Sequence, residues 1–256
     1  MKLRVLGCSG GQVPGHNLSC FLIDDRLLID AGSVTAALPL SAQSKITDVL
    51  ITHIHLDHVL SLGLLADNLY GRAQIPINVW STPVIIEGLK KHFFNDNIWP
   101  DFTQITSPGQ PSPVLKLFCI AVHEPAHLGA YMITPVEVQH AVPSIGFFIK
   151  NKNKTLIHLG DTGPTEEVWS RANSAGDLGA VIVETSFPNR LQEVADASQH
   201  LTPQTLAGEI TKLGAHDVPI LVTHLKPRFR SEIVSELKKL KDPRIRILED
   251  GDVLRL

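Results

Sequence analysis

The sequence predicts an α/β fold, a four-layer αββα sandwich formed by one domain over residues 1–256. Strand-like runs alternate with helical patterns, and each half of the chain is first strand-rich and then helical. This order suits two sheets packed face to face with helices on the outside. The length of 256 residues and the hydrophobic content of 43% allow one large core, and no low-complexity segment or Ser/Gly-rich linker divides the chain.

In the first half, apolar runs bounded by turn residues predict the strands, and apolar residues at helical spacing predict the helices. The segment Gly10–Gly15 is rich in glycine and proline, which indicates a turn between the first two strands. Pro83 suits the first turn of a helix because its missing amide is not needed there. We expect strands at 3–7, 20–23, 27–29, 49–52 and 77–80, and helices at 58–69 and 83–94.

The middle of the chain is strand-rich, and the second half alternates strands with helices. Asn151–Lys154 is typical of a hairpin turn. Thr202 and Pro203 mark the start of one helix, as an N-cap residue and a first-turn proline. We expect strands at 114–122, 136–140, 146–150, 155–159, 179–185, 219–223, 246–248 and 253–256, and helices at 166–175, 191–198, 203–213 and 231–240.

Composition excludes several classes of protein. The formal net charge is −3, so no global basic field would collect nucleic acid. No run approaches the ~18 apolar residues of a membrane span, and the N-terminal residues 1–6 suit a strand better than a signal peptide. The cysteines Cys8, Cys20 and Cys119 are odd in number and widely spaced, which favours reduced thiols and a cytoplasmic location.

The most informative segment is Thr52-His53-Ile54-His55-Leu56-Asp57-His58, directly after an apolar run. Residues two apart in an extended chain point the same way, so His53 and His55 can aim at one point. If a helix follows, Asp57 and His58 return toward that point. Imidazole and carboxylate are ligands that suit a divalent metal such as zinc. A histidine-rich turn without metal is the alternative, because histidines also cap and hydrogen-bond.

Three further metal-type residues follow buried-type strands: His140, Asp161 and His224. Loops at strand ends are where α/β folds place their chemistry. Each of these residues taken alone could be structural, but as an ordered set they predict a metal site. His158, in contrast, falls inside a buried-type strand and is expected to be a core histidine.

The chain resembles the metallo-β-lactamase superfamily. The residues that carry the resemblance are the His53/His55/Asp57/His58 cluster, His140, Gly160-Asp161-Thr162, His224 and the strand-turn Leu28-Ile29-Asp30-Ala31-Gly32. The resemblance covers nearly the whole chain. It implies two divalent ions, most simply Zn²⁺, with Mn²⁺ or Fe²⁺ also accepted by this ligand set. It also implies that Asp30 orients the histidine loop. One ion would be held by His53, His55 and His140, the other by Asp57, His58 and His224, and Asp161 would bridge them.

The segments Glu184–Pro188 and Ser198–Pro203 narrow the reaction. His200 precedes a predicted helix, and a helix N-terminus beside an imidazole is a natural phosphate pocket. His200 could also protonate a departing alkoxide; the alternative is that it only caps the helix. Histidines of this type resemble the phosphodiesterase branch of the superfamily, which includes tRNA 3′-processing endonucleases and class II cyclic-nucleotide phosphodiesterases.

The segment Phe93–Phe102 and the extended run from His53 to Leu65 resemble the class II cyclic-nucleotide phosphodiesterases, although Gly63 and Ala66-Asp67 depart from the usual pattern. An ordinary hydrophobic lid is the alternative for Phe93–Phe102. We expect hydrolysis of a 3′,5′-cyclic nucleotide, cAMP or cGMP, to the 5′-monophosphate. The expected catalytic residues are Asp57, Asp161 and His200, and the expected substrate contacts are His200, Ser186, Phe187 and Trp99.

Two other activities remain open. One is an RNA or DNA phosphodiesterase of the tRNA-processing type. The resemblance to those enzymes implies a long inserted arm that holds the tRNA elbow, but the short spacing between His140 and Asp161 leaves room only for a hairpin, which disfavours this activity. The run Lys226–Arg230 could meet phosphate or be a solvated helix start. The other is a lactone or thioester hydrolase, which would not need a phosphate pocket. A small-molecule substrate, no membrane partner and, by resemblance only, a homodimer complete the expectations.

Overall fold

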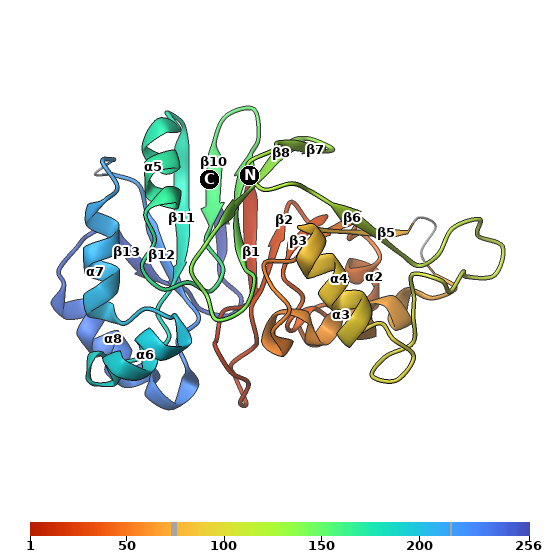
Figure 1. Ribbon diagram of the computed structural model, residues 1–256, viewed down its shortest axis with the longest axis horizontal. Coiled ribbons are helices and arrows are strands. Elements are labelled where there is room, and N and C mark those ends of the chain that lie inside the picture. The colour runs from red at the N-terminus through yellow and green to blue at the C-terminus, as the bar shows by residue number, and fades with distance from the viewer. Residues whose placement is uncertain (73–75, 216) are drawn as a thin grey trace.

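The computed structural model describes residues 1–72, 76–215 and 217–256, and its helices lie outside two facing sheets (Figure 1). Each sheet has seven strands in the described residues. The first sheet has the spatial order β14 (Val253–Arg255), β1 (Lys2–Gly7), β2 (Cys20–Ile23), β3 (Leu27–Ile29), β4 (Asp48–Leu50), β5 (Ile77–Ser81) and β6 (Leu115–Cys119). The second has the order β13 (Ile245–Ile247), β12 (Ile220–Thr223), β11 (Leu178–Glu184), β10 (Thr155–His158), β9 (Ile145–Lys150), β8 (Tyr131–Glu137) and β7 (Ala126–Leu128).

Helices cover the outer face of each sheet (Figure 1). On the side of the first sheet lie α1 (Val34–Ala37), α2 (Leu40–Gln43), α3 (Leu56–Leu69) and α4 (Pro83–His92). On the side of the second lie α5 (Glu167–Ser174), α6 (Gln192–Ser198), α7 (Pro203–Thr211) and α8 (Arg230–Lys239), with short 3₁₀ helices at Asn189–Leu191 and Pro227–Phe229. The predicted αββα sandwich is therefore confirmed.

Two hydrophobic clusters hold the layers together. The larger lies between the sheets and under α3 and α4, with Phe21 and Phe147 from opposite sheets both fully buried. The smaller joins the second sheet to its helices around Trp169. Each cluster buries mainly aliphatic side chains, and such burial is the dominant favourable term in folding.

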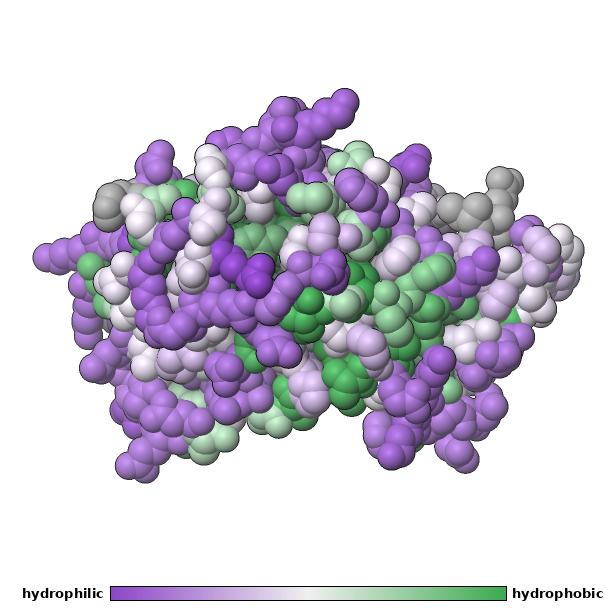
Figure 2. All heavy atoms as spheres, turned by 45° about the horizontal axis from the view of Figure 1, so that its top comes forward, coloured by the Kyte–Doolittle hydropathy of each residue, from purple (hydrophilic) through white to green (hydrophobic). Residues whose placement is uncertain are grey.

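The chain ends meet in the first sheet, because β1 pairs antiparallel with β14. The amide of Leu256 donates to the carbonyl of Met1 at 2.9 Å, and the two ends lie side by side in Figure 1. Figure 2 shows hydrophilic side chains over much of the visible surface and hydrophobic ones gathered toward its middle. Within the described part of the chain, no helix combines the length and apolarity that crossing a membrane requires.

Most predicted elements occur within a few residues of their expected limits, and local chemistry explains several of them. Thr202 caps α7 through a reciprocal capping box with Thr205, and Pro203 occupies the first turn. Pro83 likewise opens α4. The Asn151 side chain accepts hydrogen bonds from the amides of Asn153 and Lys154, both at 2.9 Å, and so closes the β9–β10 hairpin.

One predicted strand is misplaced. The strand expected at 136–140 is β8, which begins earlier, at Tyr131, and ends at Glu137. Pro135 pairs with Phe147 inside β8 although proline normally argues against a strand interior. Residues 138–140 instead form an irregular segment that carries His140 away from the sheet. The short elements α1, α2 and β7 were not predicted.

Candidate metal centre

The predicted metal-type residues come from strand ends that meet at one edge of the sandwich. Strands β10, β11 and β12 run parallel, so their carboxyl ends lie at the same edge. Asp161 follows β10, and His224 follows β12 directly. From the first sheet, the chain leaves β4 through Thr52 and reaches His53 and His55 just before α3 begins.

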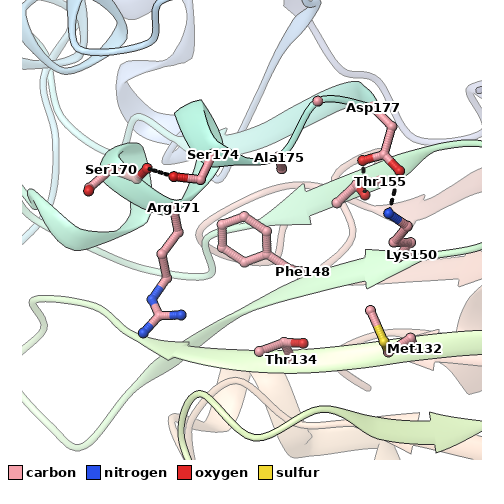
Figure 3. Close-up of a pocket in the computed structure, with 11 residues that line it drawn as sticks. Met132, Thr134, Phe148, Lys150, Thr155, Ser170, Arg171, Ser174, Ala175 and Asp177 are labelled. Carbon is pink, nitrogen blue, oxygen red and sulfur yellow. Dashed lines mark hydrogen bonds and ion pairs between the residues drawn. The ribbon is translucent and has the colours of Figure 1, made fainter.

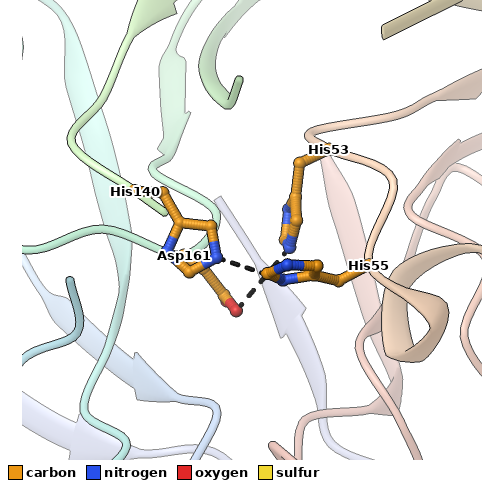
Figure 4. Close-up of side chains that lie close together, drawn as sticks. All are labelled: His53, His55, His140 and Asp161. Carbon is orange, nitrogen blue, oxygen red and sulfur yellow. Dashed lines mark hydrogen bonds and ion pairs between the residues drawn. The ribbon is translucent and has the colours of Figure 1, made fainter. Parts of the chain in front are cut away.

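Two groups of side chains converge at this edge and share Asp161. In each group, one ligand atom per residue lies within 4.8 Å of every other. The groups are His53, His55, His140 and Asp161, and Asp57, His58, Asp161 and His224. Figure 4 shows the first group, with His53 and His55 on one side and His140 and Asp161 on the other. All seven residues expected as metal ligands are therefore brought together; their role as ligands remains a prediction.

Asp161 stands between the groups. Its Oδ2 lies 3.4 Å from His58 Nε2, 3.3 Å from His224 Nε2 and 3.9 Å from His53 Nε2. Burial opposes its ionisation, but His224 and His58 outweigh this effect and hold the pKa of Asp161 well below the usual range. A lowered pKa favours the carboxylate form, which is the form that binds a metal ion.

Neighbouring groups fix the tautomer of His53 and His58. The buried Asp30 carboxylate accepts hydrogen bonds from His58 Nδ1 at 2.7 Å and from Thr52 Oγ1 at 3.0 Å. Because the Thr52 hydroxyl donates to Asp30, it accepts from His53 Nδ1, also at 3.0 Å. His53 Nε2 is then a buried lone pair, and it has no hydrogen-bond partner among the described residues. A lone pair in this position is what a bound cation would satisfy.

The same logic holds for His224 and His140. Ser186 Oγ donates to Glu184 Oε2 at 2.7 Å, so it accepts from His224 Nδ1 at 2.8 Å. His140 Nδ1 donates to the carbonyl of Gln199 at 3.2 Å. Both rings therefore direct Nε2 toward the centre, where it lies 3.2 Å from Asp57 Oδ2 for His224 and 3.1 Å from His55 Nδ1 for His140. Several acceptors facing one another fit a divalent cation.

The charges of the centre agree with this fit. Burial lowers the pKa of His53, His55 and His140, which favours the neutral imidazole that binds metal. For His58, burial also favours the neutral form, but Asp161 and Asp30 outweigh it and raise the pKa well above the ordinary value. Carboxylates that stabilise a protonated ring at this place would also stabilise a metal ion.

The backbone is shaped to deliver two of these residues. His224 has φ +63°, a left-handed conformation that is uncommon for a residue with a side chain. Gly10 packs against it so closely that an added Cβ would lie 2.6 Å from the His224 carbonyl oxygen and 2.7 Å from Nδ1. Gly160, with φ +67°, provides the turn that precedes Asp161.

His200 forms a third group with Glu184 and His224. Its Nδ1 donates to Glu184 Oε1 at 2.5 Å, which leaves Nε2 available, and its ring lies 5.0 Å from that of His140. Burial alone would lower the pKa of His200, but the Glu184 carboxylate outweighs burial and raises it. Glu184 was not predicted as a site residue. The signal was present, because a carboxylate that ends a buried parallel strand beside β12 needs a partner.

The α7 N-terminus does not offer the phosphate pocket that the sequence suggested. The amide of Gln204 donates to Asn189 Oδ1 at 2.8 Å, that of Thr205 to Thr202 Oγ1 at 3.3 Å, and that of Leu206 to the Thr202 carbonyl at 2.8 Å. Pro203 has no amide to donate. The first turn is therefore occupied by capping interactions, and a phosphate contact at this end would depend on the His200 side chain.

The three other residues expected to contact substrate are packed against neighbours. Ser186 is fully buried and holds His224, as described above. Phe187 is 8% exposed, with the Lys226 ammonium 5.2 Å above its ring and the His200 ring 5.7 Å away. Trp99 is half-buried over Gly63 of α3, where an added Cβ would lie 2.7 Å from the indole. The contact explains why glycine stands at position 63; substrate contact by these residues remains a prediction.

Comparison with known proteins agrees with the geometry. The model of the class II cAMP phosphodiesterases matches residues 35–161. A probable 3′,5′-cyclic-nucleotide phosphodiesterase of Yersinia pestis is 28% identical over 98% of this chain and 88% of its own length.

Two solved structures share the fold. Unliganded yeast PDE1 superposes with a TM-score of 0.82 at 22% identity, covering 100% of this chain and 99% of that one. The metallo-β-lactamase fold protein YhfI from Bacillus subtilis superposes with a TM-score of 0.79 at 20% identity, covering 99% and 98%. The described residues thus combine a metallo-β-lactamase fold with His/Asp clusters suited to a divalent metal.

Proposed function

We propose that this chain hydrolyses 3′,5′-cyclic nucleotides such as cAMP or cGMP to 5′-monophosphates, because it has the metallo-β-lactamase fold and its residues 35–161 match the class II cAMP phosphodiesterases. The observation that carries the proposal is the convergence of seven metal-type side chains, in two groups that share Asp161, beside the Glu184–His200 pair. A thioester would not require such a pair, because a thiolate departs without a proton.

We further propose that the centre holds two ions, most simply Zn²⁺. His53, His55 and His140 would hold one, and Asp57, His58 and His224 the other, with Asp161 between them. When bound, the ions would neutralise phosphoryl oxygens and lower the pKa of a water molecule for attack on phosphorus. Asp30 and Ser186 keep the rings of His58 and His224 oriented through the hydrogen bonds at their Nδ1 atoms.

His200 supplies the proton for the departing 3′ oxygen. Glu184 accepts the hydrogen bond from Nδ1, which leaves Nε2 as the atom that donates. The raised pKa of His200 keeps the ring protonated closer to neutral pH, as a general acid requires. General acid catalysis of this kind contributes about 10²- to 10⁴-fold in rate.

A substrate panel on metal-loaded protein tests the proposal. The panel contains cAMP, cGMP, 2′,3′-cyclic nucleotides, bis(p-nitrophenyl) phosphate, a precursor-tRNA trailer, a lactone and a thioester. We expect 3′,5′-cyclic nucleotides to have the highest kcat/KM and to yield 5′-monophosphates. A higher kcat/KM for the trailer, the lactone or the thioester would refute the proposal.

Three subsidiary expectations accompany it. Residues 1–256 would act as one hydrolase domain, and two copies would form a dimer, which sedimentation measures directly. A cytoplasmic location is supported by Cys8, Cys20 and Cys119, which are all free thiols. Fractionation of cells checks the last expectation.

A further inference from the structure

Two surface cavities of the protein differ in whether their walls suit a ligand. One, of about 450 Å³, lies between α5 and strands β8–β10 on the outer face of the second sheet (Figure 3). Its charges are already paired: Lys150 Nζ lies 2.7 Å from Asp177 Oδ2, and Arg171 Nε lies 2.8 Å from Glu167 Oε1. None of the predicted site residues lines it. Nothing in its walls requires a ligand.

The other cavity, of about 550 Å³, lies between the start of α4 and the segment that joins β8 to β9. We call it the His140 groove; its walls include Pro83, Val84, Val122, Glu137, His140 and Val142. Sites for small molecules typically have volumes of roughly 300–1,000 Å³ and predominantly apolar walls. The groove therefore has the size and character of a small-molecule site.

The groove begins at the candidate metal centre. His140 is one of its lining residues, and His140 Nε2 lies 3.1 Å from His55 Nδ1 in the first metal group. The far end of the β8–β9 segment is also tied to the histidine motif, because the Ile145 amide donates to the Thr52 carbonyl at 3.0 Å. A phosphate at the centre would thus lie against the same histidine that lines the groove.

The chemistry of the groove walls restricts which part of a substrate molecule can bind there. No lysine or arginine lines the groove, and Glu137 is its one carboxylate. Thr82 and Ser144 also line it, and their buried hydroxyl oxygens have no hydrogen-bond partner among the described residues. Valine and proline walls suit the faces of a flat uncharged ring, while the Glu137 carboxylate suits a hydrogen-bond donor at its edge.

We propose that the His140 groove receives the nucleoside part of the substrate and that Glu137 selects bases with an amino group at the position of adenine N6. The inference rests on the proposed function, because it assumes a cyclic nucleotide at the metal centre. A carboxylate only accepts hydrogen bonds. Adenine and cytosine offer an amino donor at this position, N6 and N4, whereas guanine and uracil present a carbonyl oxygen there, O6 and O4.

Three variants of the metal-loaded protein test the groove, with kcat and KM measured for cAMP, cGMP and cUMP. Val142→Trp fills the groove, and we expect KM to rise at least about tenfold, since a blocked pocket loses its apolar contacts. Glu137→Gln introduces an amide that can donate as well as accept. We expect the wild-type preference for cAMP over cUMP, about tenfold from one hydrogen bond to a charged group, to shrink to about twofold.

Val253→Trp is the matched control, because it adds the same bulk at a position in β14 that is 55% exposed and outside the groove. We expect its kinetic constants to equal those of the wild type. Circular dichroism and metal content confirm that each variant is folded and loaded. A folded, loaded Val142→Trp protein with wild-type KM values, or a Glu137→Gln protein with an unchanged base preference, would overturn the proposal.

Failure of the proposed function gives a different result. If the wild type does not hydrolyse cyclic nucleotides, the function is wrong, and equilibrium binding of 5′-AMP and 5′-UMP then tests the groove alone. Tighter binding of 5′-AMP that Val142→Trp weakens would support the nucleoside site. Equal binding of both nucleotides by the wild type and Val142→Trp would refute it.

Discussion

Replacing Asp30 by asparagine tests whether the buried hydrogen-bond network holds the metal ligands. Asp30 is fully buried and follows β3 with φ +55°, a conformation that asparagine adopts as readily as aspartate. The substitution therefore leaves backbone and volume unchanged and alters only the acceptors. Asp30 Oδ1 accepts from the Thr52 amide at 2.9 Å, and Oδ2 accepts from His58 Nδ1 at 2.7 Å.

An asparagine amide can satisfy only one of these two donors. The other then faces an NH₂ group, and an unsatisfied buried donor costs about 1–3 kcal/mol. Loss of a partner that orients a metal-binding histidine typically weakens metal affinity about 10- to 100-fold. We therefore expect Asp30→Asn to bind Zn²⁺ about 10- to 100-fold more weakly than the wild type.

Competition with a chromophoric chelator at fixed pH measures this affinity. Asp25→Asn is the control, because Asp25 is an exposed carboxylate paired with Lys2 and Arg4 at the surface. Surface pairs contribute about 0–1 kcal/mol, so we expect unchanged Zn²⁺ affinity in the control. An Asp30→Asn protein that binds Zn²⁺ within twofold of the wild type would refute the reasoning.

Three other predictions follow from single contacts. His200→Ala should lower kcat about 10²- to 10⁴-fold while bound metal, measured by elemental analysis, stays at the wild-type level; unchanged turnover would rule out its role as general acid. Gly63→Ala should lower Tm by several degrees, because the added Cβ would lie 2.7 Å from the Trp99 ring and overpacking costs about 1–3 kcal/mol; an unchanged or higher Tm would show that the indole moves freely. Burial lowers the pKa of His158 to about 4, so its stabilisation of the fold is present above the ordinary value of 6.5 and is lost as the pH falls toward 4. Between pH 7 and pH 5 this loss of stability amounts to about 2 kcal/mol. The variant His158→Asn keeps an acceptor for the Gly160 amide but does not titrate, so the dependence of its unfolding free energy on pH, measured with denaturant, should be flatter than that of the wild type by this amount. Parallel pH profiles for the two proteins would contradict this prediction.

Long periodic elements of the fold could be predicted because local chemistry and tertiary packing agree there. The helix that became α3 has apolar residues at helical spacing, and Val59, Leu62 and Leu65 are indeed buried. His158 was expected in the core, and it is 1% exposed, with its ring edge-on to Phe21. The burial of such residues can be predicted from the pattern of their own strand or helix.

Elements that depend on partners could not be predicted as well. The strand β7, Ala126–Leu128, is three residues long and owes its form to pairing with β8. The start of β8 was missed because Pro135 interrupts the pattern of a strand, yet its ring is accommodated opposite Phe147. Short helices such as α1 likewise form too few turns to leave a periodic signal.

The candidate metal centre was likewise predicted only in part. His53, His55, Asp57 and His58 are close in sequence, and their convergence follows from a strand that turns into a helix. The position of Glu184 at the end of a buried strand signals that it needs a partner, but the sequence does not show that this partner is His200, because 16 residues separate the two. Nor does the sequence show that the first-turn amides of α7 are already bonded.

Reconstitution of metal-free protein tests the central account most directly. Chelator-stripped protein is titrated with Zn²⁺, or with Mn²⁺ or Fe²⁺, while bound metal and hydrolysis of a 3′,5′-cyclic nucleotide are followed together. We expect loss of activity on stripping, binding of two equivalents per chain and return of activity as the second equivalent binds. Activity that survives complete removal of metal, or a protein that binds no divalent ion under these conditions, would contradict it.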